Sequence, residues 1–347
     1  MTFPSAEFGG HTIAVSDLTR WQGQPLIAFL GVATEGSFIY DVFPAWADVL
    51  GIDWALRGVD LPLTAGPASY RSLLTALHTT TAIAGAVVTN HKLPVYASGK
   101  KLFVGTDLFA TVAREVNAIS SSHGLRGYAR DPLSLTLILP SVLDPAPRRM
   151  VCFGAGGAAT ALLIAYATHA DKSEFQRRLL PRVPRPHMSF IDANSDALAA
   201  LQRVTRTCDL TEDEVELIHT SHDRAIDMAL SATAPGDLVV NATGLGKQSP
   251  GSPLPDARRL TAGVTAWDLN YRGPLTFITQ ASHAHAIAVD GWDYFVAGWA
   301  GALTAIASVP LTSALLRRFA ASAEPFRPIR PHEIPSHPTG GNTKELM

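Results

Sequence analysis

The sequence predicts a two-domain α/β fold, in which strands alternate with helices in both domains. An apolar segment before residue 154 breaks into a glycine-rich turn and continues as a second apolar segment, which is typical of a strand that leads into a buried helix. Short apolar segments bounded by turn residues lie on both sides of it along the chain. The length of 347 residues, 47% of them hydrophobic and 17% charged, suits two domains with filled cores.

The glycine-rich turn has the spacing of a dinucleotide-binding motif, Gly-x-Gly-x-x-Ala. Gly154 allows the tight turn, Gly156 lets the backbone approach a pyrophosphate, and Ala159 keeps the helix close to the sheet. Free N–H groups at the start of such a helix bind phosphate, so we expect a Rossmann-type domain for a nicotinamide or flavin nucleotide. The alternative is a run of small residues that only allows close helix packing. The expected nucleotide contacts in the turn are Gly154, Ala155, Gly156, Gly157 and Ala158.

The elements can be placed in order along both domains. In the first domain we expect strands at residues 25–32 and 85–89 and helices at residues 43–50, 69–77 and 107–116. In the second domain the later strands are expected at residues 188–191, 238–241 and 263–269. The Arg- and Pro-rich residues 171–186 are interpreted as an insertion, and the acidic residues 212–216 as the start of a helix.

The C-terminal part is predicted to hold one long helix and a tail. Residues 294–316 carry no charge and are numerous enough to span a bilayer, but small residues and Pro310 interrupt the apolar character. We favour a helix buried between the domains, with Arg317 and Arg318 at its C-terminal end, where cations suit the helix dipole. Residues 322–347 hold many prolines and few large apolar residues, which predicts a flexible tail.

Charge and composition argue against several classes of partner. The formal net charge of -2 and the scattered basic residues give no general attraction for nucleic acid or an anionic membrane. Cys152 and Cys208 form neither a disulfide framework nor a zinc site. His283 and His285 are two residues apart and would lie on different helix faces, so no metal site is expected. The N-terminal residues lack the pattern of an export signal, which predicts a cytoplasmic protein.

Six short motifs, taken in order over residues 26–320, resemble those of the shikimate/quinate dehydrogenase family. They are Gly85-Ala-Val-Val-Thr-Asn-His-Lys92, Glu115-Val-Asn117-Ala-Ile, Gly127-Tyr-Ala-Arg-Asp131, Asn241-Ala-Thr-Gly-Leu-Gly, Asp268-Leu-Asn-Tyr271 and Gly291-Trp-Asp-Tyr-Phe-Val. The first is similar to the family's G-x-N-V-T-x-P-x-K loop, shortened by one residue. The resemblance, to a divergent member, implies a substrate domain of residues 1–131 completed by residues 292–321, a nucleotide domain of residues 132–291, and an active-site cleft between them.

A lysine and an aspartate are the candidate catalytic residues. Hydride transfer at a carbinol carbon needs a group that gives or takes the hydroxyl proton, and a lysine held by a carboxylate in a partly dry cleft can do this. The resemblance places Lys92 and Asp131 at the positions of the family's catalytic pair. From sequence position alone, Lys92 would be an exposed loop lysine and Asp131 a turn residue before Pro132.

The resemblance also assigns candidate substrate contacts. Thr89 and Asn117 match positions where the family binds substrate hydroxyls, and Tyr271 belongs to a motif that lies beside the nicotinamide. The family's S-x-S motif, which holds the substrate carboxylate, aligns with Glu35-Gly36-Ser37, so one hydroxyl donor is replaced by an anion.

An ionised Glu35 would repel a carboxylate and could accept hydrogen bonds from hydroxyls or attract an amine. Alternatively, Glu35 points to solvent and the carboxylate is held elsewhere. Other positions differ from the family as well, since Val87 and Ala129 replace asparagines and Gly298 lies near the position of a substrate-binding glutamine.

The choice of cofactor depends on Asp192, at the end of the second strand of the nucleotide domain. An acid there binds the ribose hydroxyls and repels a 2′-phosphate, which favours NAD. Asp192 could instead cap a helix, and Arg182, Arg185 or Arg203 could reach a phosphate, so NADP remains the alternative. Further candidate cofactor contacts are Asn194, Asn241, Thr243 and Gly244.

We therefore expect an NAD-dependent oxidoreductase that reversibly oxidises a ring hydroxyl of a shikimate-like cyclic polyol, with altered recognition at the carboxylate end. One alternative is a genuine shikimate or quinate dehydrogenase that holds the carboxylate through other residues. Another is a nucleotide-binding regulator that has lost catalysis. The expected partner is a small polyol or hydroxy acid, and a homodimer is left open.

Overall fold

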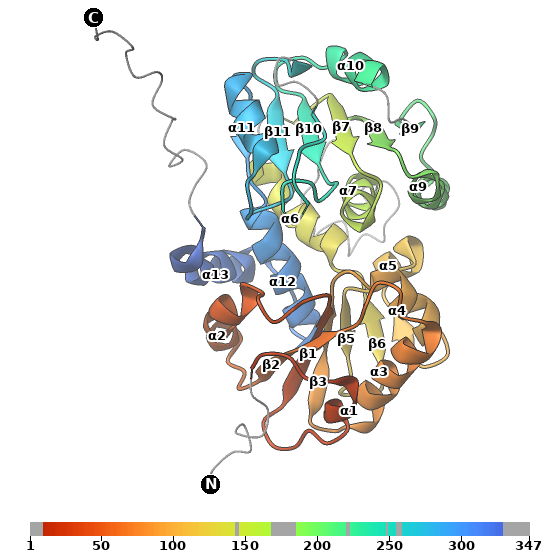
Figure 1. The fold of residues 1–347 in the computed structure, drawn as a ribbon, viewed down its shortest axis with the longest axis vertical. Coiled ribbons are helices and arrows are strands. Elements are labelled where there is room, and N and C mark those ends of the chain that lie inside the picture. Colours follow the sequence, from red (N-terminus) through yellow and green to blue (C-terminus); the bar gives the residue numbers. More distant parts are fainter. Residues whose placement is uncertain are drawn as a thin grey trace, which may run out of the picture.

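The chain forms two six-stranded sheets, one from each half, which lie toward opposite ends of the molecule (Figure 1). The computed structural model describes residues 10–142, 146–167, 185–219, 223–247, 249–254 and 259–328. The expected α/β class is confirmed, because most strand pairs are parallel and helices alternate with strands in both halves.

The first sheet has the strand order β2-β1-β3-β5-β6-β4. Its strands are β1 (Leu26–Gly31), β2 (Ala55–Asp60), β3 (Ile83–Val88), β4 (Gly105–Thr106), β5 (Ala118–Ser120) and β6 (Arg126–Tyr128). Its helices are α1 (Val15–Leu18), α2 (Ile39–Leu50), α3 (Pro67–Thr79), α4 (Lys92–Gly99) and α5 (Leu108–Ala113). β1 pairs in parallel with β2 and β3, whereas β5 is antiparallel to β3 and β6. Every residue of β1 is buried, as expected for a central strand with covered faces.

The second sheet is parallel throughout, with the order β12-β11-β10-β7-β8-β9. Its strands are β7 (Arg149–Phe153), β8 (His187–Asp192), β9 (Val215–His219), β10 (Leu238–Asn241), β11 (Thr265–Asp268) and β12 (Ile287–Val289). Its helices are α7 (Gly157–Ala167), α9 (Ser195–Thr207), α10 (Asp223–Ser231) and α11 (Thr276–His283). The strand order reverses between β7 and β10, and in such sheets ligands bind outside the carboxyl ends of the strands at this point.

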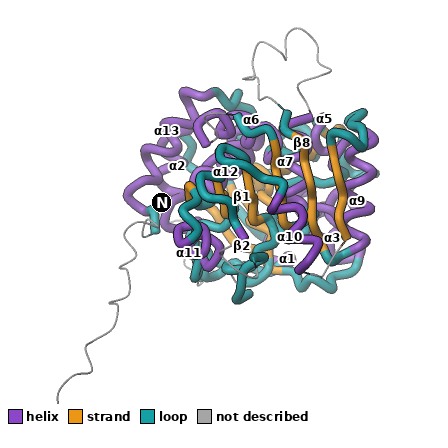
Figure 2. The backbone as a smooth tube through the Cα atoms, turned by 90° about the horizontal axis from the view of Figure 1, so that it is seen from above, coloured by secondary structure: helices purple, strands orange, loops and turns teal. Residues whose placement is uncertain are grey.

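Two long helices connect the halves. α6 (Asp131–Val142) and α12 (Trp292–Ile306) lie between the sheets (Figure 1). They pack closely, because a Cβ on Gly301 of α12 would lie 2.4 Å from Oγ of Ser134 on α6. α13 (Ser313–Ala323) lies beside α2 (Figure 2), and Nε1 of Trp46 donates to the carbonyl of Phe319 at 3.1 Å. The C-terminal segment therefore returns to the first half of the chain.

The prediction of a single helix over residues 294–316 is wrong. α12 ends at Ile306, and α13 begins at Ser313, where the hydroxyl of Thr312 accepts a hydrogen bond from the N–H of Leu315 at 3.1 Å. Pro310 lacks the N–H that would bond the carbonyl of Ile306, so it disfavours a further turn of α12 and falls in the connection. Arg317 and Arg318 consequently lie inside α13 and not at the end of the buried helix. No helix among the described residues is long and apolar enough to cross a membrane.

Three further expectations differ from the structure. The helix expected over residues 107–116 ends at Ala113, because Arg114 takes a left-handed conformation with φ of 55°. The acidic residues 212–216 begin no helix: they form a turn and enter β9, which pairs with β8. The tail expected from residue 322 is structured at first, since α13 and the 3-10 helix η3 (Glu324–Phe326) continue and Arg327 pairs with Asp290 at 2.9 Å. Residues 329–347 and most of the predicted insertion at 171–186 lie outside the described residues.

Candidate active site

Lys92 and Asp131 form an ion pair between the two sheets. Nζ of Lys92 lies 2.5 Å from Oδ2 of Asp131, and the two side chains are 20% and 9% exposed. Lys92 is the first residue of α4, after the turn that follows β3, and Asp131 is the first residue of α6. The pair predicted from the sequence is thus brought together and largely removed from bulk water.

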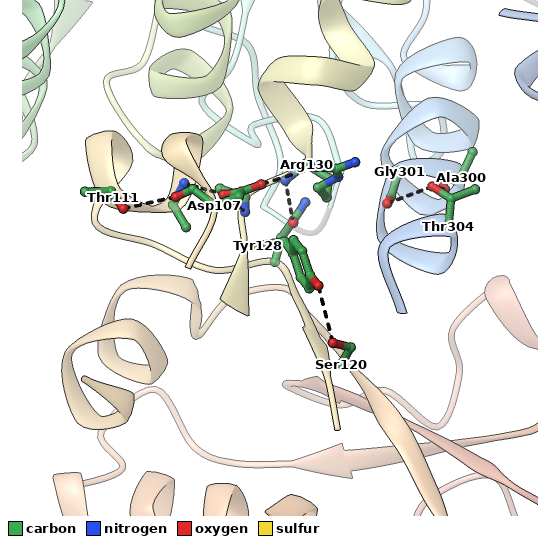
Figure 3. A network of polar contacts seen from close by, with 11 residues as sticks. Asp107, Thr111, Ser120, Tyr128, Arg130, Ala300, Gly301 and Thr304 are labelled. Atoms are coloured by element: carbon green, nitrogen blue, oxygen red, sulfur yellow. Dashed lines mark hydrogen bonds and ion pairs between the residues drawn. The ribbon is translucent and has the colours of Figure 1, made fainter. Parts of the chain in front are cut away.

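Asn117 completes this group from the strand side. Its Nδ2 donates to Oδ1 of Asp131 at 2.6 Å, and its Oδ1 accepts the N–H of Arg130 at 2.8 Å. The second contact determines which end of the amide faces Asp131. Arg130 is itself held by Asp107, with Nη1 3.3 Å from Oδ2 (Figure 3). A chain of polar contacts therefore orients the aspartate that holds Lys92.

The electrostatic balance keeps Lys92 protonated. Burial opposes the ammonium charge, but Asp131 and Glu115 more than offset this effect, and the pKa of Lys92 lies above its usual value. The same charges act on Tyr294 of α12. Burial and the charge of Asp131 raise the pKa of its phenol. At neutral pH the lysine is a charged hydrogen-bond donor that can release its proton only to an acceptor it contacts.

Glu115 is a residue of the site that the sequence analysis did not assign. It is only 3% exposed, and Oε2 lies 3.0 Å from the place where a Cβ on Gly157 would be. Burial raises the pKa of Glu115 to about 7, with Lys92 lowering it in part and Asp131 raising it. A signal was present in the sequence, since the motif similar to the family's A-V-N begins with glutamate in place of alanine.

The other predicted hydroxyl-binding position, Thr89, lies at the end of β3. Its Oγ1 donates to the carbonyl of Leu30 at 3.2 Å and lies 3.1 Å from Oδ1 of Asn90. On the opposite side, a Cβ on Gly298 of α12 would lie 3.5 Å from Oδ1 of Asp131, with no other described atom outside the backbone of α12 within 4 Å. The absence of a side chain at Gly298 leaves space beside the carboxylate of Asp131.

Glu35 already has partners within the protein. Its carboxylate accepts the N–H of His11 at 3.0 Å and the hydroxyl of Thr12 at 2.7 Å, and these bonds lower the pKa of Glu35. The side chain therefore fastens the N-terminal segment to the loop after β1. Ser37 lies in the same loop and donates its N–H to the carbonyl of Thr34 at 2.9 Å.

Tyr271 follows β11 and joins an aromatic cluster. Its ring stacks on Phe295 of α12 at 4.3 Å between centroids and lies 6.4 Å from the ring of Phe38, the residue after Ser37. Two cations approach the same ring: Nζ of Lys247 at 5.6 Å and the guanidinium carbon of Arg272 at 5.8 Å from the centroid. Burial and the charge of Arg272 lower the pKa of Lys247. Neither cation forms an ion pair with a residue in the described part of the chain.

The glycine-rich turn connects β7 to α7 and contacts the loop after β10. Gly154 has a φ of +102°, and a Cβ there would lie 2.8 Å from the carbonyl oxygen of Ala242. Both observations require glycine at this position. At Gly156, by contrast, a Cβ would meet no atom of the described chain within 4 Å. The space above Gly156 is therefore open to a ligand, next to the free N–H groups that begin α7.

Asp192 holds the turn in place. Its Oδ2 accepts the N–H of Ala155 at 2.7 Å, and its Oδ1 accepts the N–H of Asn194 at 2.8 Å. Asn194 is the N-cap of α9 and accepts the N–H groups of Asp196 and Ala197. The acid at the end of β8 thus lies beside the glycine turn, and Asn194 takes the helix-capping role that was the alternative for Asp192.

The loop after β10 is organised by a buried asparagine. Oδ1 of Asn241 accepts the N–H of Thr243 at 3.1 Å and its hydroxyl at 2.7 Å, while Nδ2 donates to Asp268 at 3.1 Å. Gly244 takes a φ of +78° in the same loop. Burial raises the pKa of Asp268 to about 6. Nowhere in the described ranges do three or more His, Cys, Asp or Glu side chains come together as metal ligands would.

Comparisons with known proteins find similar solved structures, but no matching family model or curated sequence. Among solved structures, a shikimate dehydrogenase in complex with NADP+ is similar with a TM-score of 0.67 and 20% identity, over 87% of this chain and 96% of that one. The quinate dehydrogenase of Corynebacterium glutamicum in complex with NAD has a TM-score of 0.65 and 20% identity, over 86% and 99% of the two chains. The 5-ketofructose reductase of a Gluconobacter strain has a TM-score of 0.60 and 18% identity, over 87% and 99%.

Proposed function

We propose that this chain, which has the fold of the shikimate and quinate dehydrogenases, is an NAD-dependent oxidoreductase that reversibly oxidises a ring hydroxyl of a shikimate-like cyclic polyol. The observation that carries the proposal is the buried contact between Lys92 and Asp131, with Asn117 on the second carboxylate oxygen. These groups lie between the two sheets, and the glycine turn after β7 of the second sheet is open at Gly156.

The residues of the site suit proton transfer to an oxygen. When a ketone is reduced, the ammonium of Lys92 donates a hydrogen bond to the carbonyl oxygen and then its proton, which gives the alcohol and leaves a neutral amine. When the alcohol is oxidised, the amine takes the hydroxyl proton. Asp131 holds the lysine in both directions and favours its charged form, and Asn117 and Thr89 can bind neighbouring hydroxyls. The nicotinamide, when bound, supplies or accepts the hydride.

The nucleotide site favours NAD through its charges. The carboxylate of Asp192 keeps free lone pairs beyond the two N–H groups that it accepts, so it can bind ribose hydroxyls and would repel a 2′-phosphate. Two arginines that could bind such a phosphate have partners elsewhere. Arg185 pairs with Glu214 at 2.7 Å, and Arg203 donates to the carbonyl of Ala199 at 3.2 Å. Arg182 lies outside the described residues.

Changing Asp192 to Asn tests the cofactor preference, because an amide keeps one acceptor oxygen and loses the charge. We expect the ratio of kcat/KM with NAD to that with NADP to fall by about tenfold or more. An unchanged ratio would contradict the role of Asp192.

The residues that would bind the carboxylate end of the substrate differ from the serine motif of the family. Lys247 and Arg272 follow the carboxyl ends of neighbouring strands β10 and β11, next to Tyr271, and offer two cations without acidic partners among the described residues. Two adjacent cations repel each other, so an anionic group between them would relieve that repulsion. They are our candidates for binding a substrate carboxylate, whereas Glu35 is occupied by His11 and Thr12.

A second candidate is a neutral ketose or cyclitol without a carboxylate. Two observations favour it: glutamate replaces a serine at position 35, and the similar structures include a 5-ketofructose reductase. Oxidation assays with shikimate, quinate, neutral cyclitols and aminocyclitols, and reduction of 5-ketofructose, each with both nucleotides, distinguish these substrates. An enzymatic function is supported if reduced nicotinamide is formed or consumed and if this turnover requires Lys92. Tight nucleotide binding without turnover of any of these compounds would favour a regulator.

A further inference from the structure

Glu115 is a buried acid that the proposed reaction does not use. It follows Arg114, whose left-handed conformation ends α5 and turns the chain toward β5. The carboxylate lies against the first residue of α7, with Oε2 3.0 Å from the Cβ position of Gly157. Asn117, two positions further along the chain, contacts Asp131, so Glu115 lies between the proton-transfer pair and the start of the nucleotide-binding helix.

Among the described residues, none donates a hydrogen bond to the carboxylate of Glu115. Lys92 of α4 attracts its charge, Asp131 of α6 repels it, and the phenol of Tyr294 on α12 lies in the same electrostatic environment. α7 itself carries no charged residue. A carboxyl group in these surroundings exchanges its proton close to neutral pH.

The start of α7 is also where the proposed dinucleotide would place its diphosphate, because the free N–H groups of the first turn bind anions. An ionised Glu115 beside Gly157 would repel the diphosphate, because its own side chain is only 3% exposed and water screens its charge poorly. A neutral carboxylic acid would not repel it and could donate a hydrogen bond to a phosphate oxygen.

We propose that Glu115 couples nucleotide binding to proton uptake: the protein binds the dinucleotide with Glu115 neutral, so binding above neutral pH takes one proton from solvent. This inference rests on the proposed dinucleotide site and adds a residue that makes cofactor affinity depend on pH. Below the pKa of Glu115 the free protein already carries the proton, and affinity is constant. Above it the free protein is ionised, so affinity falls by about tenfold per pH unit.

The experiment measures the dissociation constants of NADH, NAD+ and ADP-ribose by titration calorimetry from about one pH unit below to two units above neutral. ADP-ribose carries the diphosphate and lacks the nicotinamide, so all three ligands should show the same decline in affinity. In buffers of different ionisation enthalpy, the full-length protein should take up about one proton per ligand at the alkaline end. Glu115→Gln should bind all three with nearly constant affinity and without proton uptake. Glu212→Gln, at an exposed turn, should behave as the wild type.

Three outcomes contradict the coupling. The first is an affinity of the wild type that does not change with pH. The second is an equal decline in Glu115→Gln, and the third is a decline with NAD+ alone. Either of the last two would place the titrating group elsewhere. If neither the wild type nor Glu115→Gln binds any of the three ligands, the proposed nucleotide site itself fails, and that result is distinct from binding that is tight but independent of pH.

Discussion

Nζ of Lys92 lies 2.5 Å from Oδ2 of Asp131, although the two residues are 39 positions apart and begin different helices. A carboxylate suits the positive end of a helix dipole, whereas an ammonium does not. Lys92 therefore depends on Asp131 for its charged form. This dependence determines how the site should respond to pH and to substitution.

Changing Asp131 to Asn should move the pH profile of the reaction. The amide keeps the size of the side chain but removes the larger of the two carboxylate charges that raise the pKa of Lys92, so burial would then lower that pKa against Glu115 alone. We expect the rise of kcat/KM for alcohol oxidation with pH to shift to lower pH, and the maximal rate to fall by about 100-fold or more. The profile is measured with saturating nucleotide. A rate that falls without any shift would mean that Asp131 does not set the protonation of Lys92.

Glu115 should affect stability as well as binding. Its pKa of about 7 in the folded protein lies above the ordinary value of 4.5, so the fold favours the neutral form. The ionised form therefore costs stability that increases as pH rises from the lower value to the higher one and stays constant above it. Glu115→Gln should gain about 3 kcal/mol in the free energy of unfolding at alkaline pH and little in acid. Denaturation with urea at two pH values checks this, and an equal effect at both would contradict it.

Two glycines of the turn should respond differently to the same substitution. Gly154→Ala places a side chain at positive φ and 2.8 Å from a carbonyl oxygen, so it should destabilise the fold by about 1–3 kcal/mol. Gly156→Ala meets no atom of the described chain and should leave the melting temperature nearly unchanged. It should nevertheless weaken nucleotide binding by about tenfold or more, because the added methyl group occupies space left for the pyrophosphate. Unchanged binding by a stable Gly156→Ala variant would place the nucleotide elsewhere.

Lys247 and Arg272 should distinguish acidic from neutral substrates. Replacing both with Ala removes two cations beside Tyr271 without touching the Lys92 pair. We expect KM for a cyclic hydroxy acid to rise by about tenfold or more, while kinetics with a neutral cyclitol stay within about twofold. The matched control is Arg318→Ala on α13, which donates to the carbonyl of Val49 and lies outside the site. An equal change for both substrates would exclude a carboxylate-specific role.

The sequence predicted the features that depend on local patterns. The glycine turn and the buried strand before it are encoded by consecutive residues, as is the acid at the end of β8, and the structure has the expected strand, turn and helix there. The contact of Lys92 with Asp131 was expected only through the resemblance, because no spacing rule brings the two side chains together. The likeness to solved structures confirms the expected fold.

The features that the sequence did not predict depend on contacts between distant residues. Glu115 stands inside a recognised motif, but its burial arises because Arg114 adopts a left-handed turn and α7 packs against it. Glu35 faces His11 and Thr12 because the N-terminal segment pairs beside β2, where Thr12 bridges to Gly58. The cations beside Tyr271 come from loops after two separate strands, and only the parallel pairing of β10 with β11 brings them together.

Proton transfer by Lys92 is tested by the variant Lys92→Ala. With the nucleotide and the substrate that the wild type converts, we expect a loss of at least about 100-fold in kcat, because the proton donor is removed. The dissociation constant for the nucleotide, measured on the same preparation about one pH unit below neutral, where Glu115 is protonated with or without Lys92, should stay within about twofold of the wild type. Turnover of Lys92→Ala at close to the wild-type rate would contradict the assignment of proton transfer to this lysine.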